Sequence, residues 1–264
     1  MNPFDNKKYG EHKVFNQLTD YSEFYEDLSD GIMGWTTPGT NAAINLDTYV
    51  YSSIKGTLES INDVLRKGRI NDSYALLRKY YDSTIINVYS NLYLSDNFSI
   101  DNFVVQKIDN WLKGKERLPE YREMSKYIKD SPKLVTITNL LNQDKTYKDI
   151  RDRCNDHTHY NYFHNLLIND NEVYLENERL TALDNFSKDI EDILIQHLAY
   201  ILYLNDHYMM SSDYTDSLEM GMKPDDDWQY LVAPFIQDIF DKVLKPRRMD
   251  IVTEIKSKTE MRLD

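Results

Sequence analysis

The chain has 264 residues, of which 41% are hydrophobic, a net charge of −13 and one cysteine. This length and apolar content suit one large domain or two small ones with a buried core, and the lone Cys154 excludes an internal disulfide or a multi-cysteine zinc site. The acidic balance argues against a protein that coats DNA, because phosphate binding needs a basic surface.

The ends of the chain and its apolar runs indicate a location away from membranes. The longest apolar candidate, Ile193–Leu204, is too short to cross a bilayer and contains Gln196 and His197. The N-terminus has no charged segment followed by an apolar one, and residues 1–10 are polar and predicted to lack regular structure. We therefore expect a cytoplasmic protein with no membrane contact.

Helical periodicity dominates the first part of the chain. Phe15–Leu28 is predicted to form a short helix, and Gly34–Gly39 a loop because of its Gly and Pro residues. A strong helix is predicted from Asn45 to about Gly68. Its apolar stripe, with steps of three and four, consists of Val50, Ile54, Leu58, Ile61 and Leu65. Asn71 can cap the next helix, and the short link between the two predicts an antiparallel pair.

The second part of the chain continues the helical pattern. The predicted helices are Ser99–Trp111, Glu120–Ile128, Ser131–Leu141, Tyr147 to about Asp156, Leu180–Tyr208, Leu231–Leu244 and a helical pattern within 247–264. Residues 165–174 are predicted as a polar turn region with some strand character. Residues 209–224 are predicted to be an acidic connector.

These patterns predict an all-α protein. Its core is expected to be a helical bundle of four or more helices, with additional N- and C-terminal helical segments. In chain order, we expect an N-terminal extension over residues 1–40 and the bundle over 41–208. An acidic connector and C-terminal helices, over 209–264, are expected to pack on the bundle.

The most informative stretch is Tyr147–Asn161. We call its part with the sequence RDRCNDHTHYN, residues 151–161, the Arg/His segment. Three of the six histidines of the chain lie between His157 and His164. Imidazole is suited to proton transfer near neutral pH, and guanidinium is suited to holding a phosphate. The segment therefore indicates binding or cleavage of a phosphodiester.

An arginine followed by a histidine near the end of a bundle helix resembles the motif of the HEPN superfamily (higher-eukaryote and prokaryote nucleotide-binding). The motif fits in two registers, Arg153 with His159 and Arg151 with His157. The ending N-D-H-T-H-Y-N is similar to that of some bacterial members, which favours His159. The helix L-L-R-K-Y-Y-D at residues 76–82 also resembles a bacterial HEPN-like branch, with Asp in place of Glu.

The resemblance covers roughly residues 45–208 and implies a bundle that is often dimeric. Many members are metal-independent ribonucleases of toxin, CRISPR or phage-defence systems, and others are inactive nucleotide-binding or scaffolding modules. In the active case His159 would be an acid or base, and Arg153 would neutralise the phosphate. Asn155 would orient the imidazole or contact a sugar hydroxyl, and Arg151 and His157 would support them. No metal and no cofactor is expected.

The spacing of the motif sets a geometric condition. A six-residue step on an ideal helix separates Arg153 and His159 by about 120°. They converge only if the helix ends or bends before His159, or if a partner chain completes the site. Arg153 and His157, four residues apart, share a face directly.

Several basic residues outside the segment are candidates for binding nucleic acid. Lys113, Lys115 and Arg117 are the best phosphate-facing candidates in the chain. Arg78 forms an i,i+4 pair with Asp82, and it can also support Asn155 or His159.

Two functions remain open at this point. The first is an endoribonuclease of HEPN type, acting as a homodimer on RNA in a toxin or antiviral defence system, and the Arg/His segment favours it. The second is a non-catalytic helical module that binds a nucleotide or a regulatory protein partner, and the charge of −13 favours it. A zinc site built from Asp156, His157, His159 and His164 is a third reading with little support elsewhere in the chain. His197, on an apolar stripe, is predicted to be a buried, hydrogen-bonded histidine.

Overall fold

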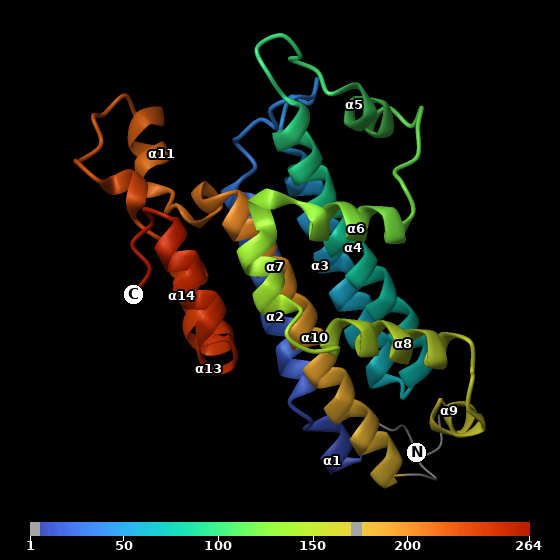
Figure 1. Cartoon of the computed structure of the whole chain (residues 1–264). Helices are drawn as coiled ribbons and strands as arrows, with labels where there is room; N and C mark the ends of the chain where they lie inside the picture. The colour runs from blue at the N-terminus through green and yellow to red at the C-terminus, as the bar shows by residue number, and fades with distance from the viewer. Residues whose placement is uncertain (1–5, 170–175) are drawn as a thin grey trace. The chain divides into compact units, whose positions relative to one another are not determined.

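The regular structure of the chain is helical, as the periodicity predicts. The structure is a computed structural model that describes residues 6–169 and 176–264. Over these residues it forms no β-strand, only two isolated bridges (Figure 1). The predicted all-α class is thereby confirmed. None of the described helices combines the length and the apolar character needed to cross a membrane.

The helices follow one another with short connections. Those of the first part are α1 (Lys7–Gly10), α2 (Val14–Gly31), α3 (Leu46–Arg66), α4 (Ile70–Asn97), α5 (Gln106–Leu112), α6 (Tyr121–Asp130) and α7 (Val135–Leu141). Those of the second part are α8 (Thr146–Thr158), α9 (Phe163–Ile168), α10 (Glu176–Leu204), α11 (Asp213–Glu219), α12 (Pro234–Ile239), α13 (Lys245–Arg247) and α14 (Met249–Lys258). Short 3₁₀ turns occupy Pro132–Leu134, Asp206–Met209 and Trp228–Tyr230.

Some local predictions are wrong. Residues 7–10 form α1 instead of lacking structure, because the Asn6 side chain accepts hydrogen bonds from the backbone N–H groups of Lys8 and Tyr9 and the Tyr9 ring is buried. Residues 163–168 form α9 instead of a turn with strand character, and the rest of that segment, 170–174, lies outside the described residues.

Two further boundaries differ from the predictions. The acidic connector contains the short helix α11. The helix expected from Ser99 begins only at Gln106, because Val105 is extended and its N–H bonds to the Gly39 carbonyl at 2.8 Å.

Two compact units make up the chain, and neither is one continuous segment. Unit 1 contains the described parts of residues 1–26, 50–84 and 144–194. Unit 2 contains residues 27–49, 85–143 and 195–264. The division falls within α2, α3, α4 and α10. The division by chain order into 1–40, 41–208 and 209–264 stays a prediction.

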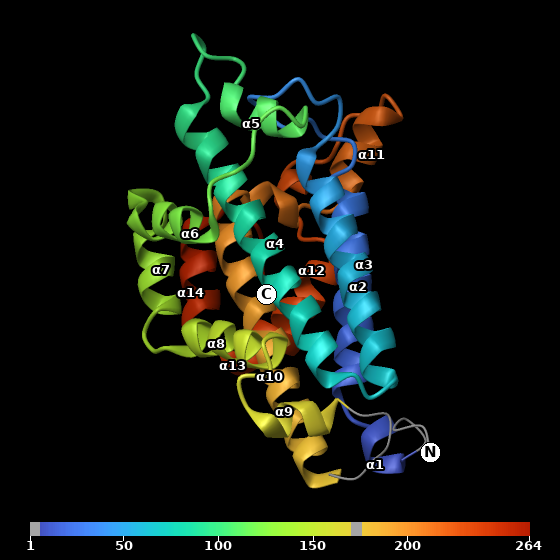
Figure 2. The same ribbon diagram turned by 90° about the vertical axis from the view of Figure 1, so that its right-hand side faces the viewer.

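In unit 1, α3 and α4 form the predicted antiparallel pair (Figure 2). Their turn depends on Gly68, whose φ of 74° is strained for other residues, and the N–H of Arg69 bonds back to the Val64 carbonyl. Four of the five predicted stripe residues of α3 are fully buried: Ile54, Leu58, Ile61 and Leu65. The helix α8 lies across α4 and α10 in both views, and the side-chain contacts below hold it there.

In unit 2, His197 has the predicted role of a buried, hydrogen-bonded histidine. It is 1% exposed, and its Nε2 lies 2.8 Å from the Asn87 side-chain oxygen. The Asn87 amide is oriented by Asp47, which accepts a hydrogen bond from its nitrogen at 2.7 Å. Nε2 is therefore the protonated ring nitrogen. Burial lowers the pKa of His197 to about 3, so the ring is neutral at neutral pH.

The last helix of unit 2, α14, packs on α7. Pro246 has no N–H, and the turn before it widens into a π-helical turn over Phe240–Leu244, where the Lys245 N–H bonds to the Phe240 carbonyl. The helix α14 then contacts α7, and a guanidinium nitrogen of Arg248 donates to the Leu140 carbonyl at 2.7 Å.

Gly39→Ala is expected to lower the free energy of unfolding by about 1 to 3 kcal/mol. Gly39 has a φ of 82°, and an added Cβ would lie 3.0 Å from a Leu94 methyl and 3.2 Å from a Val105 methyl. Gly56→Ala is the control, because Gly56 lies inside α3 with open space around it, and this change should stabilise by up to about 1 kcal/mol. Urea unfolding of both variants measures the difference. Equal effects would contradict this account of Gly39.

Candidate functional site

The Arg/His segment is placed by the buried side of α8. Ile150 and Cys154, one turn apart, are 1% and 0% exposed and anchor the helix in unit 1. Burial raises the pKa of the Cys154 thiol to about 12, so this thiol is an apolar core group rather than a nucleophile. Of the polar residues of the segment, Arg151, Asn155 and His157 contact α4, and Arg153 contacts α10.

Arg153 is held by a carboxylate of α10. Its Nε and Nη2 atoms donate to the two oxygens of Asp189 at 2.7 and 3.0 Å, a bidentate ion pair. The Asp189 side chain is 3% exposed and that of Arg153 is 35% exposed. Burial raises the pKa of Asp189, while Arg153 opposes that shift, so the pair depends on its mutual contact. The Nη1 group of Arg153 makes no hydrogen bond within the part of the chain that the structure describes.

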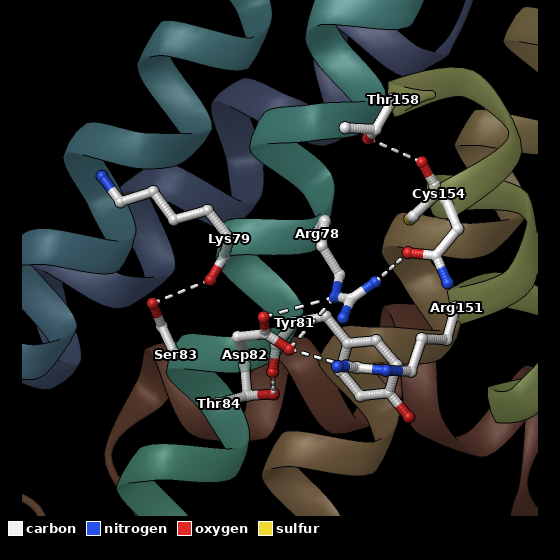
Figure 3. Close-up of polar contacts among 10 residues, drawn as sticks. Arg78, Lys79, Tyr81, Asp82, Ser83, Thr84, Arg151, Cys154 and Thr158 are labelled. Atoms are coloured by element: carbon white, nitrogen blue, oxygen red, sulfur yellow. Dashed lines mark hydrogen bonds and ion pairs between the residues drawn. The ribbon is translucent and has the colours of Figure 1, made fainter. Parts of the chain in front are cut away.

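Arg151 and Arg78 share a second carboxylate, Asp82 (Figure 3). Arg151 Nη1 lies 2.7 Å from Asp82, and Arg78 Nε lies 3.2 Å from the same carboxylate. Arg78 also donates to the side-chain oxygen of Asn155. Of the two contacts predicted for Arg78, the structure shows the one with Asn155, and its role at a site stays a prediction.

His157 is oriented by Asn71, a residue of α4. Its Nδ1 lies 2.6 Å from the Asn71 side-chain oxygen, and the Asn71 nitrogen donates to the Asn165 carbonyl at 2.6 Å. Because this second bond fixes the Asn71 amide, Nδ1 of His157 carries the ring proton and Nε2 carries the free lone pair. The ring also stacks on Tyr74, with centroids 4.0 Å apart and planes 4° apart.

The charge state of His157 follows from its surroundings. Burial, and then the nearby His164 and Arg153, lower the pKa of His157 to about 4, and Asp156 opposes the shift. At neutral pH the ring is therefore neutral and has a single tautomer. A bound anion would raise this pKa, because an opposite charge favours the protonated form.

A pocket of about 390 Å³ lies beside this ring in unit 1. It is lined by Tyr74, His157 and His164, together with residues of α10 that include Glu178 and Asn185. Nε2 of His157 makes no hydrogen bond within the described segments. His164 is exposed and stacks with Tyr162 at 5.8 Å. The pocket thus combines two imidazoles with carboxylate and amide groups.

His159 lies just past the end of α8. The helix ends at Thr158, and Tyr160 has a φ of 49°, so the chain turns at the point that the spacing requires. The His159 ring is exposed and makes no side-chain hydrogen bond in residues 6–169 and 176–264. It is therefore accessible to a ligand or to a second chain.

The predicted phosphate-binding residues lie in both units. Arg78 belongs to the cluster around α8, whereas Lys113, Lys115 and Arg117 belong to unit 2. Lys113 pairs with the buried Asp109, and Lys115 and Arg117 are exposed. The cluster around α8 is built from unit 1 alone.

Sequence reasoning missed three residues that shape the site. Asn71 was interpreted as a helix cap, but α4 begins at Ile70 and the Asn71 side chain orients His157. Neither Tyr74 nor Asp189 was singled out by the sequence: Tyr74 stacks on His157, and Asp189 pairs with Arg153. The only signal for Asp189 was an acidic residue within the apolar pattern of the longest helix.

The third reading, a metal site, finds no geometry to support it among the described residues, where no three His, Cys, Asp or Glu side chains are grouped to hold an ion. Comparison of the chain with protein-family models, curated proteins and solved structures returned no match. The class of protein is thus defined by the fold and the site alone: an all-α protein with a neutral, oriented histidine beside paired arginines.

The low pKa of His157 makes the protein sensitive to acid. Above pH 6.5 the ring is neutral in both states, and between pH 6.5 and about 4 only the unfolded chain takes up the proton. The free energy of unfolding should therefore fall as pH drops through this window, and His197 acts in the same direction. Urea unfolding from pH 7 to 4 measures the slope, which should be smaller in His157→Gln. An unchanged slope in that variant would contradict the assignment.

Proposed function

We propose that the protein is a metal-independent ribonuclease of HEPN type, acting in the cytoplasm as a toxin or phage-defence effector. The observation that carries the proposal is His157. Its ring is fixed in one neutral tautomer with Nε2 free of hydrogen bonds among the described residues, and His157 lines a pocket together with His164. A base with this geometry can accept the proton of a ribose 2′-hydroxyl.

The reaction needs one acid and one source of positive charge besides this base. The 2′-oxygen attacks the adjacent phosphorus, and the bond to the 5′-oxygen breaks, leaving a 2′,3′-cyclic phosphate and a 5′-hydroxyl. We assign the proton for the leaving 5′-oxygen to His164, which lines the same pocket. Arg153 supplies positive charge through the part of its guanidinium that Asp189 does not use.

We assign His159 to a contact with a second chain rather than to the pocket beside His157. It lies between α8 and an exposed apolar stretch that contains Tyr160, Tyr162, Phe163, Leu166 and Leu167. A large exposed apolar stretch is typical of a surface that another chain covers. We assign this stretch to a homodimer contact, in which His159 faces the site of the partner chain.

A second function is favoured by a specific observation. Both Arg151 and Arg153 are already paired with carboxylates, and a histidine with a pKa of about 4 is a weak base. These properties suit a module that binds a nucleotide, or a regulatory protein, without cleaving anything. In that case the pocket beside His157 would hold the base or phosphate of the ligand.

RNA cleavage in EDTA separates the two functions. The purified full chain is incubated with a mixed-sequence RNA, beside His157→Gln, His164→Ala, His159→Ala and Arg153→Lys. The lysine variant keeps a positive charge opposite Asp189, so that loss of folding is not mistaken for loss of catalysis. His12→Asn is the matched control, because His12 lies in unit 1, contacts the Val14 N–H and Asp184, and does not line the pocket.

The ribonuclease proposal expects cleavage that survives EDTA, is lost in His157→Gln and persists in His12→Asn. Calorimetry with nucleoside monophosphates is run on the same samples. Saturable binding with no cleavage of any RNA would replace the ribonuclease by the binding module. Cleavage that EDTA abolishes would overturn the metal-independent mechanism.

A further inference from the structure

Unit 2 contains a larger cavity that the proposed ribonuclease does not use. Its volume is about 800 Å³. The lining combines the loop 34–38, the end of α4 and residues 205–210, and it includes Trp35, Asn91, Phe98, Asn205, His207 and Tyr208. All of these residues belong to unit 2, so the cavity is complete within one unit.

Aromatic rings form one side of this cavity. The Trp35 ring lies 4.9 Å from His207 and 5.6 Å from Tyr208, with planes tilted by 32° and 33°. Trp35 is partly exposed, and Phe98, on the α4 side, is 41% exposed. The faces of aromatic rings attract cations and flat organic groups.

A buried carboxylate, that of Asp47, is hydrogen-bonded to two residues that line the cavity, Asn91 and Tyr208. Asp47 is 2% exposed and accepts hydrogen bonds from Asn87 at 2.7 Å, Asn91 at 3.0 Å and Tyr208 at 2.7 Å. All three partners are neutral, and Asp47 makes no ion pair with any residue that the structure describes. Burial raises the pKa of Asp47 to about 6, and it therefore remains mostly ionised at neutral pH. A buried negative charge without a counter-ion is costly, and a cation nearby would offset that cost.

The amide side chains between Asp47 and the cavity have a fixed direction. The nitrogen of Asn91 must face Asp47, because a carboxylate only accepts, so the Asn91 oxygen faces away and accepts from the Asn205 nitrogen at 2.8 Å. The last polar atom in this series of hydrogen bonds, the Asn205 side-chain oxygen, makes no hydrogen bond among the described residues. Asn205 lines the cavity, and the negative charge of Asp47 polarises this acceptor through the Asn91 amide.

The other charged and titratable groups near the cavity do not cancel the negative field of Asp47. Lys133 reaches Ser95 on the lining at 2.7 Å, but it also pairs with Asp96 at 2.8 Å. Burial lowers the pKa of His207, which keeps this ring neutral at neutral pH, and the adjacent Asp206 adds negative charge. The cavity thus offers aromatic faces, an unpaired acceptor and a negative field.

We propose that this cavity binds a small organic cation that carries N–H donors, a protonated amine or amidinium with a flat or aromatic body. The N–H groups donate to the Asn205 oxygen, and the body lies against Trp35. The field of Asp47 selects the charged form over a neutral compound of the same shape. The proposal is independent of ribonuclease activity, because it uses residues of unit 2 alone.

The test compares benzamidine, a cation at neutral pH, with benzamide, its neutral isostere. Calorimetry on the full chain should show saturable binding of benzamidine that is about tenfold or more tighter than that of benzamide. Trp35→Ala and Asn205→Ala should each abolish or strongly weaken it. Trp228→Ala is the matched control, because Trp228 lies in unit 2, is also partly exposed and does not line the cavity.

Each outcome decides the proposal. Equal affinity for benzamidine and benzamide would show that the cavity binds through apolar contacts alone, and it would overturn the proposal. The absence of binding by either compound would also overturn the proposal. Equal loss in Trp228→Ala and Trp35→Ala would place the binding elsewhere. Because removal of the Trp35 ring can disturb folding, circular dichroism accompanies each variant, and Asn205→Ala provides the second, milder test.

Discussion

Arg153→Ala is expected to lower the free energy of unfolding by about 2 to 3 kcal/mol, because it leaves the Asp189 carboxylate buried without its counter-charge. Asp189 is 3% exposed, and both of its oxygens are bound by Arg153. The expected loss is smaller than for a completely buried pair, since the arginine side chain is 35% exposed and partly solvated. Urea unfolding at pH 7 measures it.

Two further variants show whether this loss comes from the unpaired carboxylate. Adding Asp189→Asn to Arg153→Ala should recover most of the stability, because the buried charge is then removed. Lys242→Ala is the control, since its ion pair with Asp238 is exposed on both sides and should contribute little. The loss should also shrink at low pH, where Asp189 is protonated. A loss no larger than that of Lys242→Ala would contradict the geometry of the pair.

His157→Gln is expected to reduce RNA cleavage by about a hundredfold or more, the usual effect of removing a general acid or base. The glutamine retains a polar group at this position but has no ring nitrogen to accept a proton. The rate is measured at single turnover with saturating protein, so that the chemical step is compared rather than binding. His12→Asn should cleave at the wild-type rate.

The pH profile distinguishes positioning from catalysis at the same site. Asn71 can affect the proposed reaction only through His157. We therefore expect Asn71→Ala to lower the rate and to shift the acid limb of the pH profile, because the fixed tautomer of His157 is lost. A rate that falls with no change of profile would make Asn71 merely structural. A wild-type rate in His157→Gln would remove His157 from the mechanism.

The fold was largely predictable because its signal is local. The stripe of α3, the turn at Gly68 and the antiparallel α4 follow from periodicity and turn chemistry. The short helices were harder. The helix α1 depends on a cap at Asn6 and on burial of Tyr9, and such effects on four residues leave little trace in the periodicity.

The site was only partly predictable, since its partners come from distant segments. The Arg/His segment itself was evident from the sequence, whereas the Arg78 contact with Asn155 was one of two alternatives beside His159. The pairing of Arg153 with Asp189, and of His157 with Asn71, joins residues 36 and 86 positions apart. No local pattern encodes such a pairing. The choice between His159 and His157 as the proposed catalytic histidine therefore depended on which of the two rings is buried in the fold.

The measurement that tests the central claim most directly is the identity of the ends that the protein leaves on RNA. A short RNA is incubated with the full chain in EDTA, beside the same strand with 2′-deoxyribose at every position. The account predicts 2′,3′-cyclic phosphate and 5′-hydroxyl ends on the RNA, no cleavage of the deoxy strand, and loss of these products in His157→Gln. Cleavage of the deoxy strand, or 5′-phosphate ends, would contradict attack by the 2′-hydroxyl and with it the role of His157.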